Sequence, residues 1–117
     1  MPPSDTNTPF AALPDPPYYA VIFTAQRTSG DNGYAAMAAK MSEMAQAHPG
    51  CIGMETTRDE TGFGITVSYW KTEADILDWK ADAKHLIAQQ MGKSAWYNHY
   101  ILRISKVERQ YDGPEGR

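Results

Sequence analysis

The chain has little cysteine, no clustered positive charge and no long apolar run, and each deficit excludes a class of protein. Cys51 is the single cysteine in 117 residues, which excludes an internal disulfide and a multi-cysteine metal site and suits a reducing compartment. The 11 basic residues are scattered and outnumbered by 14 acidic ones, which argues against binding to nucleic acid. No apolar run approaches the roughly 18 residues that span a bilayer, and the amino terminus has no signal-peptide pattern. We therefore expect a soluble, cytoplasmic protein with no nucleic-acid or membrane partner.

The spacing of histidines and glycines excludes further kinds of site. His48, His85 and His99 fall in three different predicted elements, with neither His-x-His nor His-x-x-x-His spacing, so no metal site is predicted. The glycines do not form a GxGxxG or Walker loop between a strand and a helix, which argues against a phosphate-bound cofactor. Cys51 has no surrounding signature of a nucleophile, and we interpret it as a small buried hydrophobic residue.

Irregular segments flank one region of regular periodicity. Residues 1–17 are rich in proline, which excludes a helix or a central strand, and we expect a flexible arm there rather than one that packs on a partner subunit. Residues 110–117 form a polar, turn-rich tail. A single domain remains at residues 18–109, and a chain of this length buries enough surface for a core without disulfides.

The apolar pattern of this domain predicts four strands and two helices. Alternating, β-branched or aromatic segments indicate strands at 18–28, 51–58, 63–70 and 94–109, with a hairpin turn at 59–62. One amphipathic helix is predicted at 34–48, after a cap at Asp31 or Asn32, and a second begins at the capping box Thr72–Asp75 and ends near Met91. The order β-α-β-β-α-β is that of the ferredoxin-like α+β fold, a four-stranded antiparallel sheet with both helices on one face.

Both faces of the predicted sheet carry apolar side chains. Alternation places two sets of the last strand on opposite faces, Trp96, Tyr100, Leu102 and Ile104 on one and Tyr97, His99, Ile101, Arg103 and Val107 on the other. Two helices cover only one face, and an uncovered apolar face of this size normally marks an interface. We therefore predict a homodimer in which two sheets pack face to face as a dimeric α+β barrel.

Aromatic and histidine residues are the remaining candidates for chemistry, and they gather late in the chain: Trp70, Trp79, His85, Trp96, Tyr97, His99 and Tyr100. Each one alone is more simply interpreted as part of the core or of a dimer interface. Together they combine flat apolar walls with titratable and hydrogen-bonding groups, as a pocket for a planar aromatic ligand requires.

The segment Tyr69–Glu108, YWKTEADILDWKADAKHLIAQQMGKSAWYNHYILRISKVE, resembles the antibiotic biosynthesis monooxygenase family. The shared features are a Trp that ends the third strand, an acidic helix start, Trp79, His85 and a Trp-Tyr pair that opens the last strand. The preceding elements are compatible, so the resemblance spans about residues 18–109. It implies a dimeric ferredoxin-like barrel. Some members of this family oxidise aromatic polyketides or quinols with O2 and no prosthetic group, others degrade haem, and many have no established reaction.

The residues argue against the haem-degrading branch. That branch has an Asn on the first strand, a Trp in the second helix and a haem-ligating His about ten residues after the Trp. Trp79 matches, but Phe23 and Gln89 stand where the Asn and the His would be. Without an axial imidazole a haem would lack its protein ligand, and His85 could replace it only if the helix were displaced.

Resemblance to the cofactor-independent branch implies that the chain uses O2 as co-substrate and needs no cofactor. Its chemistry requires a base that removes a proton from a phenol or quinol, and donors that stabilise the resulting anion. His85 suits the base near neutral pH, and His99 is the alternative. The catalytic candidates are thus His85, Tyr97 and Trp79, and the candidates for substrate binding are Phe23, Trp70, Trp96, Asn98, His99 and Tyr100. A non-catalytic sensor of aromatic ligands stays open, because no base is paired with a clear orienting residue.

Overall fold

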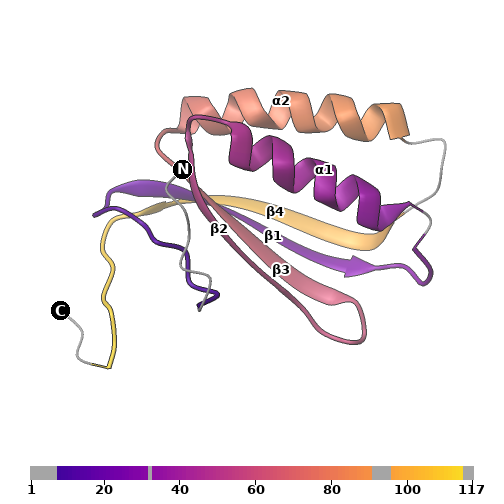
Figure 1. The fold of residues 1–117 in the computed structure, drawn as a ribbon, viewed down its shortest axis with the longest axis horizontal. Coiled ribbons are helices and arrows are strands. Elements are labelled where there is room, and N and C mark those ends of the chain that lie inside the picture. Colours follow the sequence, from indigo (N-terminus) through magenta and orange to yellow (C-terminus); the bar gives the residue numbers. More distant parts are fainter. Residues whose placement is uncertain (1–7, 32, 91–95, 115–117) are drawn as a thin grey trace.

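Six elements follow one another in the predicted order β-α-β-β-α-β (Figure 1). The structure, a computed structural model, describes residues 8–31, 33–90 and 96–114, without the side chains of 84–90. The elements are β1 (Tyr18–Arg27), α1 (Tyr34–Ala47), β2 (Cys51–Arg58), β3 (Phe63–Trp70), α2 (Glu73–Gln90) and β4 (Tyr97–Val107). The strands pair antiparallel in the order β2-β3-β1-β4, and both helices lie on one face of the sheet, so the predicted ferredoxin-like fold is confirmed.

Short polar side chains fix where the elements begin. The carboxylate of Asp31 accepts hydrogen bonds from the backbone N–H groups of Gly33 and Ala35, at 2.9 and 3.1 Å, at the start of α1. At the start of α2, Thr72 Oγ1 accepts the N–H of Asp75 at 3.1 Å and donates to its carboxylate at 2.8 Å. These groups satisfy N–H donors that have no partner within the first turn of a helix.

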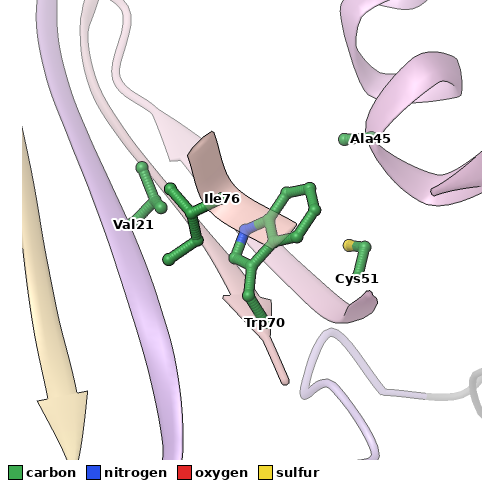
Figure 2. Close-up of a cluster of buried hydrophobic side chains, with 5 residues drawn as sticks. All are labelled: Val21, Ala45, Cys51, Trp70 and Ile76. Carbon is green, nitrogen blue, oxygen red and sulfur yellow. The ribbon is translucent and has the colours of Figure 1, made fainter. Parts of the chain in front are cut away.

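The core lies between the sheet and the two helices. It is built from Val21, Ala45, Cys51, Trp70 and Ile76, which come from five elements and converge in Figure 2. Trp70 is fully buried, and its Nε1 donates to Ser68 Oγ at 2.8 Å. Cys51 is 1% exposed within this core, which confirms its interpretation as a small buried hydrophobic residue, and burial raises the pKa of its thiol.

A β-bulge between β1 and β4 corrects the predicted alternation of the last strand. Gln26 is paired with His99, but Arg27 is paired with Tyr97, so Asn98 is the extra residue of the bulge. One extra residue shifts the side-chain alternation of a strand by one position. Tyr97 therefore shares the helix-facing side with Phe23 and Tyr100, and His99 lies on the opposite, open face of the sheet.

The open face is partly covered by the chain itself, which corrects the expectation of a free arm. A Cβ added at Gly53 would come within 2.8 Å of Leu13 and 3.0 Å of Ala11, so these two residues lie directly on β2. The N–H of Ala11 donates to Glu55 at 3.0 Å. The arm over residues 8–17 thus packs on its own sheet, although proline keeps it out of regular structure.

Candidate functional site

Four aromatic rings meet on the helix-facing side of the sheet, and we call them the tyrosine cluster. Tyr97 is central: its ring centroid lies 5.3 Å from Phe23, 5.7 Å from Tyr34 and 5.9 Å from Tyr100. The Phe23 and Tyr100 rings are 5.5 Å apart. The residues come from β1, α1 and β4, and the bulge at Asn98 turns Tyr97 toward the other three. Tyr100 is 57% exposed, so the cluster has one side in contact with solvent.

The hydroxyl of Tyr97 is held in its neutral form. Burial is the largest effect that raises its pKa well above the ordinary value, and hydrogen bonding to Tyr34 and the charge of Tyr34 raise it further. Arg58 and Arg27 act in the opposite direction, but their effect is smaller. Tyr97 therefore stays a phenol at neutral pH and can donate a hydrogen bond rather than act as a base.

Two arginines flank the same cluster. The Arg27 guanidinium carbon lies 3.6 Å from the centroid of the Tyr34 ring, and that of Arg58 lies 6.0 Å from it. Arg58 Nη2 also donates to the Tyr34 hydroxyl at 3.5 Å. Arg27, Arg58 and Tyr34 are not predicted as site residues from the sequence, because nothing in their spacing along the chain indicates that the three meet.

The three tryptophans have different environments. Trp70 and Trp96 are buried, at 0% and 6% exposure, which is the environment of core residues. Trp79 is half-buried against Trp70, with the ring centroids 5.4 Å apart. Its Nε1 is buried and has no hydrogen-bond partner among the described residues. Trp79 is thus the tryptophan with an unused donor for a ligand.

A histidine with a carboxylate partner lies away from the tyrosine cluster, at the end of α1. His48 Nε2 is 2.8 Å from Asp78 Oδ2, and Nδ1 accepts the N–H of Gly50 at 2.9 Å. The ring also packs edge-on against Trp70, with the centroids 5.4 Å apart. Since both nitrogens are engaged, His48 joins α1 to α2 and has no nitrogen left for a substrate.

The structure brings together only some of the predicted site residues. Phe23, Tyr97 and Tyr100 are in contact, whereas Asn98 is exposed at the bulge and His99 faces the open side. Trp79, on α2, packs against Trp70 and the core, and no ring contact joins it to Phe23, Tyr97 or Tyr100 among the described residues. His85 belongs to α2, but its side chain lies outside the described residues.

The described residues contain no group of three or more His, Cys, Asp or Glu side chains that could hold a metal ion. None of the helices, over the part of the chain described, is both long and apolar enough to cross a membrane.

Some known proteins are similar to this chain in sequence, and others are similar in fold. The family model for "Antibiotic biosynthesis monooxygenase" matches residues 20–91. The uncharacterized protein YqjZ of Bacillus subtilis (strain 168) is 43% identical over 97 residues, which cover 83% of this chain and 85% of YqjZ.

Two solved structures illustrate the likeness of fold. Protein SO0527 from Shewanella oneidensis has a TM-score of 0.66 at 12% identity, over 80% of this chain and 94% of that one. SnoaB from Streptomyces nogalater, a cofactor-independent oxygenase, has a TM-score of 0.63 at 7% identity, over 80% of this chain and 95% of SnoaB. At such identities the likeness concerns the fold alone.

Proposed function

The chain belongs to the antibiotic biosynthesis monooxygenase family, and on that premise we propose that it oxidises a small aromatic substrate with O2 and without a prosthetic group. The observation that carries the proposal is the tyrosine cluster on the helix-facing side, with neutral Tyr97 at its centre. The description of SnoaB as a cofactor-independent oxygenase supports the absence of a cofactor.

The substrate class follows from the side chains. Phe23, Tyr97 and Tyr100 offer ring faces and edges to a planar aromatic molecule, and stacked or edge-on contacts add to the burial of apolar area. The neutral hydroxyl of Tyr97 is the donor in the cluster for a substrate oxygen that becomes negatively charged. A quinol, a phenol or an anthrone-like polyketide meets these requirements.

The reaction needs a base, and we assign this role to His85. In an anthrone-like substrate, the base removes a proton from carbon, and the anion passes one electron to O2. The substrate radical and superoxide then combine through a new C–O bond, the protonated base returns its proton to the peroxide, and the resulting hydroperoxide loses water to leave a quinone. One oxygen atom ends in the product and the other in water, so the substrate itself supplies the electrons.

The working unit in this proposal is a homodimer. The part of the open face beyond the arm exposes Phe63, Ile65 and Ile101, at 45%, 38% and 39%. Ile65 and Ile101 are both paired with Thr24, so they flank it on that face. A second copy of the sheet would remove this apolar surface from water.

Oxygen uptake with an anthrone or a dihydroxynaphthalene tests the reaction. The wild-type protein, colourless as purified, is expected to consume O2, and His85→Ala is expected to lower kcat by at least about 100-fold because general bases contribute roughly that much. His99→Ala is the matched control, since His99 lies on the open face. Undiminished turnover in His85→Ala would overturn the assignment of the base.

Two other outcomes would replace the proposed function. Binding of the aromatic compound without O2 uptake would identify a ligand sensor. A Soret band in the purified protein would indicate haem.

A further inference from the structure

Arg58 is held over the sheet rather than extended into solvent. It belongs to β2, and on β3 it is paired with Gly64. A Cβ at Gly64 would lie 2.7 Å from the Arg58 guanidinium carbon, so the absence of a side chain at Gly64 is what lets the guanidinium cross β3. There Nη1 donates to the carbonyls of Gly62 and, at 3.3 Å, of Ala25 on β1. The charge of Arg58 is thereby placed beside Tyr34.

Arg27 is anchored in a similar way at the end of β1. Its Nε donates to the carbonyl of Trp96 at 3.2 Å, and Nη2 donates to the carbonyl of Gly30 at 3.0 Å. Arg27 is also the β1 residue paired with Tyr97. Both guanidinium groups are therefore fixed by backbone carbonyls on the helix-facing side, next to the tyrosine cluster.

These two positive charges have no negative partner among the described residues. Neither arginine forms an ion pair there; the ion pair found in that part of the chain joins His48 and Asp78. The acidic residues nearest to them in sequence, Asp31 and Asp59, use their carboxylates to accept backbone N–H groups of adjacent turns. Two half-buried like charges around one ring are costly unless an anion joins them.

We propose that Arg27 and Arg58, the arginine pair, form a subsite for the carboxylate of an aromatic acid whose ring lies against the tyrosine cluster. The inference rests on the proposed function and specifies its substrate class. A guanidinium donates two parallel hydrogen bonds to a carboxylate, and the Tyr34 ring that the pair flanks is in contact with Tyr97 at the centre of the cluster. The carboxylate would thereby orient the ligand, with its ring against the tyrosine cluster.

The test compares two ligands that differ only in the anionic group, a hydroxynaphthoate and the naphthol that lacks its carboxylate, by isothermal titration calorimetry. The wild-type protein is expected to bind the hydroxynaphthoate at least about tenfold more tightly. Arg58→Gln and Arg27→Gln are each expected to bring this ratio close to one while naphthol affinity changes by less than about twofold. Arg109→Gln is the matched control, because it removes the same charge from an exposed position after β4.

The outcomes that overturn the inference are distinct. Equal affinity of the wild type for both ligands, a preference that survives both substitutions, or failure of both ligands to bind would each contradict it. If circular dichroism shows that Arg58→Gln does not fold, the wild type alone tests the inference. A preference for the hydroxynaphthoate that comes from ion pairing with the arginines falls as the concentration of potassium chloride is raised. A preference that is independent of salt would contradict the inference. A carboxylate preference without O2 uptake would refute the proposed oxidation but leave the subsite intact.

Discussion

At the scale of single residues, hydrogen bonding distinguishes the core residue Trp70 from Trp79, a candidate for ligand binding. Trp70 and Trp79 are neighbours with their rings in contact, yet Trp70 donates to Ser68 and Trp79 has no partner among the described residues. A buried donor without a partner costs free energy in the folded protein, so the indole N–H of Trp79 is the better candidate of the two to donate to a bound ligand. The sequence predicted both tryptophans as site residues, because spacing alone does not distinguish their hydrogen bonds.

The same substitution at the two tryptophans tests this difference. Trp79→Phe removes an unused donor, so we expect a change of less than about 1 kcal/mol in the free energy of unfolding but a loss of about tenfold in kcat/KM. Trp70→Phe removes a donor that Ser68 needs and creates a cavity, so we expect a loss of about 1–3 kcal/mol in stability. Urea unfolding and oxygen uptake measure the two effects. Equal losses of stability in both variants would contradict the assignment.

At the scale of elements, the sequence predicts regular structure well and its interruptions poorly. The bounds of β2 and β3 were predicted as observed, because turn residues mark the ends at Pro49-Gly50 and Asp59–Gly62. The bulge at Asn98 was not, since a bulge depends on the pairing of two strands far apart in the sequence. This bulge residue determines whether Tyr97 or His99 lies on the same face of the sheet as Phe23. The sequence therefore predicted that aromatic residues form the candidate site, but not which of them lie together.

The hairpin turn gives a prediction with a defined pH dependence. The carboxylate of Asp59 accepts hydrogen bonds from the Thr61 hydroxyl at 2.6 Å and from the N–H groups of Thr61 and Phe63 at 2.9 and 3.1 Å. The hydroxyl of Thr61 is the main cause of a lowered Asp59 pKa. Since the folded pKa lies below the unfolded one, the stabilisation is present above the unfolded pKa of about 4 and is lost as the pH falls through the folded value.

Asp59→Asn is the informative variant, because it keeps an acceptor oxygen but does not titrate. The wild type is expected to be more stable than Asp59→Asn at about pH 6, and the difference should shrink toward about pH 2. Urea midpoints over this range measure it, with Glu60→Gln, an exposed neighbour in the same turn, as the control. A constant difference across the range would show that ionisation of Asp59 does not stabilise the turn.

At the scale of the whole molecule, the arm changes where a partner subunit is expected. The sequence predicted an apolar open face, and the sheet has one, but the contacts of Ala11 and Leu13 with Gly53 occupy its β2 part. These contacts could not be predicted because proline-rich segments have no period that assigns them to a surface. The apolar residues still exposed there, Phe63, Ile65 and Ile101, lie toward the β2-β3 hairpin and β4. A homodimer interface is therefore predicted at that part of the face.

A charge placed at the centre of this surface tests the dimer. Ile65 is 38% exposed and pairs with Thr24 of the central strand β1, so Ile65→Glu would bury an unpaired carboxylate only if a second sheet covers it. We expect the dimer dissociation constant to rise by at least about 100-fold in sedimentation experiments, with an unchanged circular dichroism spectrum. Leu77→Glu is the control, because Leu77 is 64% exposed on α2, away from the open face. A wild type that sediments as a monomer, or an Ile65→Glu variant that remains dimeric, would refute an interface at this part of the sheet.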